Sequence, residues 1–216
     1  MIQRDYFMRM INMMIAMLLR LVGFKDAKEY PKAILDIQTT GKALFGMDWD
    51  LVQQFSVPQL MQLFGSDLSV AVPKAYVVAV LLKEEAEIRG LMSGEEASEP
   101  LYMKSLALLL ETYLQFNEPV EERHREFTDA VLEKIRRRPL PVELLEMVFR
   151  YEELLGRYAN AEDALHRILE ARPEYAGEGI LFYERLLRRS REELASGGLP
   201  REEVLEGLSG LKNRPA

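Results

Sequence analysis

The amino-acid sequence predicts an all-α protein. Apolar residues recur with the 3.6-residue period of a helix along nearly the whole chain of 216 residues. No stretch shows the sustained alternation of apolar and polar side chains, rich in β-branched residues, that is typical of a strand. Proline and glycine residues separate the periodic segments. These observations favour a series of helices joined by short connections, and we expect successive helices to be antiparallel neighbours.

The predicted helices begin and end at residues that suit helix termini. Four prolines stand where a first turn is expected, because the N–H that proline lacks has no partner there. They are Pro58, Pro119, Pro141 and Pro200. Gly65 and Gly197 suit helix ends. We expect helices at about 2–23, 31–45, 57–64, 73–92, 99–116, 119–137, 141–156, 160–171, 175–195 and 200–209.

A single domain over residues 1–216 is expected, because a chain of this length can bury about 70% of its unfolded surface. We divide it into four parts by its breakers and its periodicity. They are an N-terminal hairpin at 1–47, an irregular connector with a short helix at 48–72, helical repeats at 73–195, and a short helix and tail at 196–216.

Composition and charge exclude several classes of site. The chain has no cysteine and only two histidines, which excludes thiolate zinc sites, iron–sulfur clusters, disulfides and a three-histidine metal site. No phosphate-binding glycine loop, dinucleotide fingerprint or serine-hydrolase motif occurs. The net charge of −7 lies wholly in residues 73–216, which disfavours attraction to nucleic acid. We therefore expect no cofactor, no metal and no nucleic-acid partner.

A helical repeat is suggested between Pro141 and Pro173. Gly156, Tyr158, Ala161 and Leu165 precede Pro173 at the spacing found in the second half of a tetratricopeptide repeat (TPR). In that repeat, small residues let two helices approach and large residues fill the space between them.

Two weaker copies support the same interpretation. One runs from Val80 to Leu114, and a trace of another runs from Tyr30 to Ile37. Repeats of this kind stack as antiparallel hairpins, so we predict a TPR-like right-handed array. An ordinary helical bundle is the alternative architecture.

Three segments carry a resemblance to a known family. They are the opening MIQRDYFMRMINMM, the helix containing Ala-Lys-Glu-Tyr-x-x-Ala, and LLKEEAEI at Leu81 to Ile88. The chain resembles an uncharacterised family of bacterial TPR-like proteins, a domain of unknown function. The resemblance implies a cytoplasmic bacterial protein and brings no catalytic residues.

Two short motifs raise the possibility of a di-metal site in a helical bundle. Glu121 precedes His124 by three residues, as Asp163 precedes His166, which is the spacing that such bundles use. His124 falls on the apolar stripe of its helix, whereas Asp163 and His166 point away from theirs. We therefore predict no metal, and expect a partly buried His124 and an exposed His166.

Two basic runs, at 134–138 and 185–191, could bind nucleic acid or an acidic partner. Acidic residues stand four positions away along the second run, where they would form ion pairs within one helix. The first run ends a helix, where cations offset the helix dipole. We expect solvated, paired surfaces at both.

The first helix is apolar around most of its circumference. Its polar residues form one narrow stripe of Asp5, Arg9, Asn12 and Arg20, and six of the eleven methionines of the chain lie here. Such a helix must be covered on several sides, either by the same chain or by a partner. If a partner or a second copy covers it, we expect Met10, Met14 and Met17 at the interface, because methionine repacks readily.

A membrane is a weaker alternative for this helix. The longest uncharged run, Met10 to Leu19, is shorter than the roughly 20 residues that span a bilayer. The polar stripe is not basic, which disfavours a membrane-surface helix. With no signal-peptide pattern, the cytoplasm is the expected location.

The predicted function is a noncatalytic scaffold that binds a peptide or a partner protein through a TPR-like concave face. The first helix of each hairpin lines that face in TPR-like arrays. Transferring this spacing selects Lys83, Glu87, Glu143, Glu146, Arg150 and Glu153. Their net charge of −2 favours a basic or mixed-charge partner segment. The alternative is an enzyme or small-ligand protein with a site in a helical cavity near His124.

Overall fold

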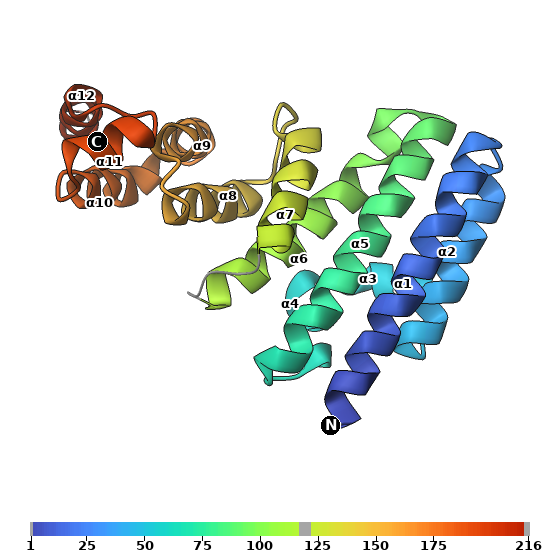
Figure 1. Ribbon diagram of the computed structural model, residues 1–216. Helices are drawn as coiled ribbons and strands as arrows, with labels where there is room; N and C mark the ends of the chain where they lie inside the picture. The colour runs from blue at the N-terminus through green and yellow to red at the C-terminus, as the bar shows by residue number, and fades with distance from the viewer. Residues whose placement is uncertain (1, 117–121, 214–216) are drawn as a thin grey trace. The chain divides into compact units, whose positions relative to one another are not determined.

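The computed structural model describes residues 2–116 and 122–213 of the chain (Figure 1). Every element assigned in these residues is a helix, so the predicted all-α class is confirmed. The chain divides into two units, Met1–Arg138 and Pro139–Ala216, where we had expected one domain. Each unit is described by itself.

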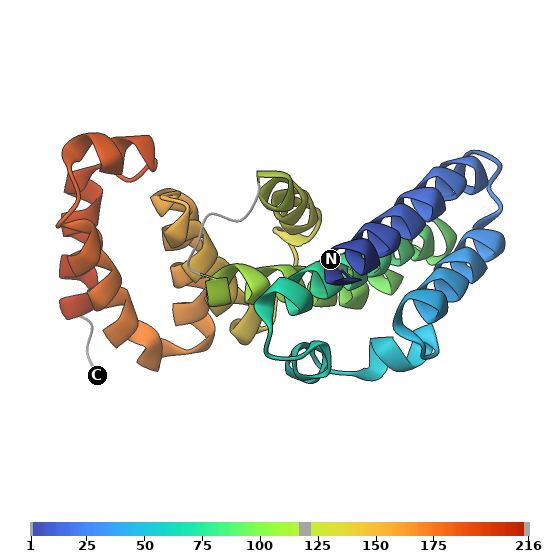
Figure 2. The ribbon, with the colours of Figure 1, turned by 60° about the horizontal axis from the view of Figure 1, so that its bottom comes forward.

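Unit 1 consists of seven α-helices and one short 3₁₀ helix in its described residues. They are α1 (Ile2–Asp26), α2 (Tyr30–Phe45), α3 (Trp49–Gln54), α4 (Val57–Phe64), α5 (Leu68–Ser93), η1 (Glu95–Ala97), α6 (Glu99–Phe116) and α7 (Glu122–Ile135). Helices α1, α2 and α5 lie side by side, and α6 packs between α5 and α7 (Figure 1). Figure 2 shows α3 and α4, in cyan and blue-green, along the connection from α2 to α5.

Helix α5 forms the centre of unit 1. Helices α1, α2, α4 and α6 all contact it, so its side chains are buried on several sides. Val78, Leu81, Leu82 and Ile88 are fully buried there. A helix that is covered in this way needs no polar face, which explains why the sequence around Val77 to Leu82 is apolar without interruption.

The connector between α2 and α5 holds two helices rather than the expected one. Helix α4 begins where we predicted, because Ser56 and Gln59 form a capping box. Helix α3 was missed, since six residues are too few to establish a period. Helix α5 begins five residues before the predicted start, because the Asp67 side chain accepts a hydrogen bond from the backbone N–H of Ser69 at 3.0 Å.

Unit 2 consists of five α-helices and a 3₁₀ helix in its described residues. They are α8 (Val142–Leu154), α9 (Tyr158–Ala171), η2 (Pro173–Tyr175), α10 (Ala176–Leu186), α11 (Arg191–Ser196) and α12 (Arg201–Lys212). Helix α8 packs on α9, and α10 packs on α12. Tyr158, Ala161 and Leu165, which carry the repeat-like spacing, are all buried.

The helix predicted at 175–195 is two helices in the structure. Helix α10 ends at Leu186, and α11 begins after Ser190. Ser190 and Glu193 form a capping box, in which the Ser190 hydroxyl accepts from the N–H of Glu193 at 3.1 Å. A serine followed three residues later by a glutamate is a sequence signal for the start of a helix. The helix predicted at 175–195 does not take this signal into account.

Close approach at two glycines shapes unit 2. A Cβ atom on Gly197 would lie 2.3 Å from Cδ2 of Tyr158 and 2.5 Å from the backbone oxygen of Gly156. A Cβ atom on Gly207 would lie 2.4 Å from Cζ of Tyr183. All three distances are shorter than atomic contact allows, so Tyr158 of α9 and Tyr183 of α10 can approach these positions only because glycine has no side chain.

Candidate partner-binding surfaces

Lys83 and Glu87, predicted as partner-binding residues, belong to a charge network between α1 and α5. The Lys83 ammonium donates to Glu84 at 2.8 Å and to Glu87 at 2.7 Å. Lys25 of α1 donates to Glu84 at 2.7 Å and lies 3.3 Å from Glu87. Because two lysines and two glutamates satisfy one another, the network ties the two helices together.

The pKa values of Lys83 and Glu87 follow from these pairs. Burial alone would lower the pKa of Lys83, but the carboxylates of Glu84 and Glu87 outweigh burial and raise it. Burial alone would raise the pKa of Glu87, but Lys83 and Lys25 outweigh burial and lower it. Lys83 and Glu87 are therefore both charged at neutral pH.

Glu87 also lines a polar cavity of about 340 Å³ in unit 1. The cavity lies among α5, η1, α6 and α7, and its charged lining residues are Glu87, Glu95, Glu99, Lys134 and Arg138. Arg138 pairs with Glu95 and lies 3.2 Å from Glu99. The cavity presents charges of both signs that are largely paired already.

Arg172, at the end of α9, clamps two of the acidic residues predicted on α8. Its guanidinium donates to Glu146 at 2.6 Å and to Glu143 at 2.8 Å. Glu146 is one-fifth exposed, whereas Glu143 is three-quarters exposed. The backbone hydrogen bond at Glu143 and the pair with Arg172 lower the pKa of the Glu143 carboxyl.

Arg185 of α10 holds the third acidic residue of α8. It donates two hydrogen bonds to Glu153, at 2.8 and 2.9 Å, and reaches Glu178 at 3.2 Å. The bidentate geometry fixes the guanidinium plane against the carboxylate. These pairs place two arginines on the same surface as the predicted residues, and they change the net charge of the predicted unit 2 set from −2 to zero.

Arg150 and Tyr175 lie on this surface but differ in accessibility. The Arg150 side chain is exposed. The Tyr175 hydroxyl is buried, so a partner cannot reach it directly. Its pKa is raised, first by burial and then by the charge of Glu146, which together outweigh the opposing charge of Arg150. The hydroxyl therefore remains a neutral donor at neutral pH.

The six predicted residues are divided between the two units. Lys83 and Glu87 lie in unit 1, and the four residues of α8 lie in unit 2. Each unit therefore has a surface of its own that contains predicted residues. In unit 2 it consists of Glu143, Glu146, Arg150, Glu153, Arg172, Tyr175 and Arg185, which we call the α8 surface.

The interface predicted on the first helix is corrected by the structure. Met10, Met14 and Met17 are buried within unit 1, at 6% exposure or less, because α2 and α5 cover this side of α1. The exposed apolar side chains of α1 are instead Met8, Ile15, Leu19 and Val22. Self-association through α1 stays a prediction, and it would have to use this other side.

Helix α1 also meets a length and composition criterion for crossing a membrane. In the described part of the chain, the segment Phe7–Asp26 is long and apolar enough, with 22% of its window buried. The shorter run predicted from the sequence stops before Arg20, whose guanidinium donates two hydrogen bonds to Asp36 at 2.9 Å. Core helices and N-terminal signals pass the same criterion, so the finding assigns no membrane.

The two histidines lie in different environments, as predicted. The His124 ring is partly buried and stacks on Tyr76 at 4.3 Å, and Phe127 meets the same tyrosine edge-on at 5.5 Å. Asp163 and His166 are exposed, and Glu121 lies outside the described residues. No cluster of three or more potential metal ligands occurs among the residues described.

The basic runs differ from each other in the structure. In the first, Arg136, which follows the last residue of α7, lies 3.3 Å from Glu133. In the second, α10 ends at Leu186, so the predicted pairs do not all lie within one helix, but the predicted pair of Arg189 with Glu193 is present. Glu184 pairs with Lys212 instead, and Arg189 lies 3.5 Å from Glu193.

The residues that organise both surfaces are absent from the predicted set. Arg172 follows α9, and Arg185 lies in α10, whereas the glutamates that they bind lie in α8. The residues of each pair are therefore too far apart in the sequence for a helical spacing to predict the contact. Glu85 was missed as well, although it is fully buried and accepts from the Trp49 indole at 2.6 Å and from Gln53 at 2.7 Å. The sequence signal for this buried residue is a glutamate within an otherwise apolar helix, because a buried glutamate needs partners.

Comparison with known proteins assigns a family. A model of a family of unknown function, DUF6483, matches residues 1–215. The chain belongs to this family. No curated protein matches the chain, and no solved structure matches it. The resemblance to an uncharacterised family is thereby confirmed, whereas its TPR-like and bacterial character stay predictions.

Proposed function

We propose that this DUF6483 protein is a noncatalytic scaffold that binds an extended segment of a partner protein on the α8 surface. The observation that carries the proposal is the arrangement of charge there. Arg172 and Arg185 hold Glu143, Glu146 and Glu153 in place, while Arg150 is exposed.

Such a surface favours a peptide over a compact anion. The ordered carboxylates accept from backbone N–H groups or cationic side chains, and Arg150 donates to carbonyl or carboxylate oxygens. A segment of mixed charge satisfies both kinds of group. The pairing of α8 with α9 and the burial of Tyr158, Ala161 and Leu165 support a TPR-like hairpin, in which the first helix faces the ligand.

The cellular location and the source of the protein are also part of the proposal. We infer a cytoplasmic bacterial protein, as the family resemblance implies. The enzymatic alternative near His124 receives less support, because Tyr76 stacks on the imidazole ring and occupies one of its faces.

The experiment uses a partner recovered with the tagged full chain from the native cell and then purified. The double variant Arg150→Glu and Tyr175→Phe removes the exposed donor together with the buried hydroxyl of the same surface, and it leaves the carboxylate clamps intact. We expect a loss of affinity of at least about tenfold, because charge-assisted hydrogen bonds contribute about 1.5 to 3 kcal/mol each. The melting temperature should change little, since Arg150 is exposed.

The matched control is Arg191→Glu, a charge reversal at an exposed arginine of α11. It changes the net charge by the same amount, and we expect it to leave the affinity unchanged. Equal binding of the purified partner to the double variant and to the parent chain would exclude the α8 surface as its site.

A further inference from the structure

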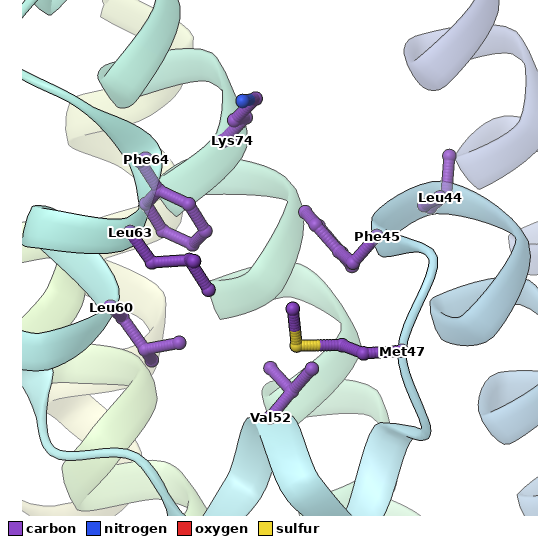
Figure 3. Close-up of a pocket in the computed structure, with 8 residues that line it drawn as sticks. All are labelled: Leu44, Phe45, Met47, Val52, Leu60, Leu63, Phe64 and Lys74. Carbon is purple, nitrogen blue, oxygen red and sulfur yellow. The ribbon is translucent and has the colours of Figure 1, made fainter.

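Unit 1 contains an apolar hollow of about 150 Å³ where the connector meets α5 (Figure 3). Side chains from the end of α2, from α3 and α4, and from the loop before α3 surround it. The lining residues are Leu44, Phe45, Met47, Val52, Leu60, Leu63, Phe64 and Lys74. Seven of the eight are apolar, and Lys74 from α5 supplies the one charge.

The residues deep in the hollow are buried, whereas a residue at its opening is exposed to solvent. Leu60 is fully buried, Val52 is 2% exposed, and the Phe45 and Phe64 rings face each other with centroids 6.2 Å apart. Leu63 is half exposed, so it lies at the opening. An apolar guest of matching size gains dispersion contacts with such a lining when it replaces water there.

Lys74 sets the chemistry of the opening. Its side chain is partly buried, and it makes no hydrogen bond or ion pair with any residue that the structure describes. Figure 3 shows it above the space between Phe64 and Phe45. A partly buried ammonium that has no counter-ion among the described residues, beside an apolar hollow, is complementary to an anion with an apolar tail.

We propose that this hollow binds a small monocarboxylic acid with an apolar part of about six carbon atoms. The size follows from the volume, because apolar cavities of about 150 Å³ accommodate a molecule such as benzene. The tail lies among Val52, Leu60 and Phe64, and the carboxylate accepts hydrogen bonds from Lys74. The site is independent of the α8 surface and goes beyond the proposed scaffold function.

The test measures binding of hexanoate to the full chain by calorimetry and by NMR of methyl-labelled methionine. We expect saturable binding with a Kd on the order of 0.1 mM, a typical value for a ligand of this size. The Met47 methyl signal should shift, because Met47 lines the hollow. Pentylamine, which has the same five-carbon tail and the opposite charge, should bind at least about tenfold more weakly.

Variants separate the charge from the apolar contact. Lys74→Gln should weaken hexanoate binding at least about fivefold and leave binding of neutral hexanol unchanged. Lys74→Arg should retain most of the affinity, which tests the charge even if the glutamine variant is poorly folded. The control Lys134→Gln changes an exposed lysine on α7 and should have no effect. Absence of saturable binding below about 10 mM, or equal hexanoate binding by parent and Lys74→Gln, would overturn the proposal.

Discussion

The two units use the same pair of chemical groups, glutamate and a cation, in different environments. In unit 1, Glu85 is fully buried and is held by Trp49, Gln53 and Arg89. In unit 2, Glu153 is one-fifth exposed and is held by Arg185 alone of the described residues. The number of partners rises with burial, because a buried carboxylate has lost its water and needs a donor for each lone pair.

This difference in burial distinguishes ion pairs that stabilise the fold from charged groups that a partner could bind. Breaking a pair around Glu85 leaves a charge in the core of unit 1, where it cannot be solvated. Breaking the pair of Glu153 and Arg185 exposes both groups to water, so little stability is lost. A partner can therefore compete for the groups of the α8 surface, whereas it cannot compete for those around Glu85.

The largest expected effect is at Glu85. Glu85→Ala leaves the buried Trp49 donor and the partly buried Gln53 donor without their acceptor, and we expect a loss of about 2 to 4 kcal/mol in the free energy of unfolding. Trp49 is the one tryptophan of the chain, so urea unfolding followed by its fluorescence reports on unit 1 directly.

Glu153→Ala is the matched comparison in unit 2. We expect a loss of less than about 1 kcal/mol, measured by circular dichroism, because the pair is partly solvated. Similar losses in the two variants would refute the distinction between buried and exposed pairs.

A smaller effect is expected from overpacking in unit 2. Ala161 is fully buried on α9, and Ala161→Leu should cost about 1 to 3 kcal/mol because the added methyl groups have no space. Ala195→Leu, at an exposed position of α11, is the control. Circular dichroism should detect the loss, while the Trp49 fluorescence transition should not move if the units unfold independently. A parent-like melt of Ala161→Leu would show that the helices are not closely packed there.

The smallest effect concerns the pH dependence of unit 1. Lys104 of α6 donates to the backbone oxygens of Val52, Gln53 and Phe55, and burial lowers its pKa from 10.5 to about 8. Between pH 8 and 10.5 the unfolded chain binds more protons at this site than the folded chain. The contribution of Lys104 to the free energy of unfolding therefore increases as the pH rises through this window.

The gain should be about 1 kcal/mol, because the side chain is only half buried. It is measured as the difference between the parent chain and Lys104→Met in urea unfolding at several pH values between about 7 and 10. This difference cancels the titration of other lysines and of tyrosines. A difference that stays constant with pH would contradict the lowered pKa of Lys104.

The sequence predicts the features that depend on local pattern. The helical period, the start of α4 after Ser56 and the burial of Ala161 all follow from residues within a few positions of one another. The break after Leu186 was equally local, but the apolar period across it concealed the capping box at Ser190.

Features that depend on distant pairing could not be predicted. Arg172 lies 26 positions after Glu146, and Trp49 lies 36 positions before Glu85. Nothing in the spacing of either pair indicates contact. The same holds for the methionines of α1, since the side that α2 and α5 cover is decided by packing rather than by the composition of α1.

The close approach of neighbouring atoms to Gly197 and Gly207 limits which substitutions these two positions can accept. Every single-base change of a glycine codon that alters the residue adds at least a Cβ atom, or ends the chain, and at these positions that atom would overlap Tyr158 or Tyr183. Tyr183 has little freedom to move aside, because its hydroxyl donates to Glu162 at 2.7 Å. In a saturation-mutagenesis library selected for folded protein, both positions should therefore be depleted of every substitution, whereas the exposed Gly210 should accept most of them.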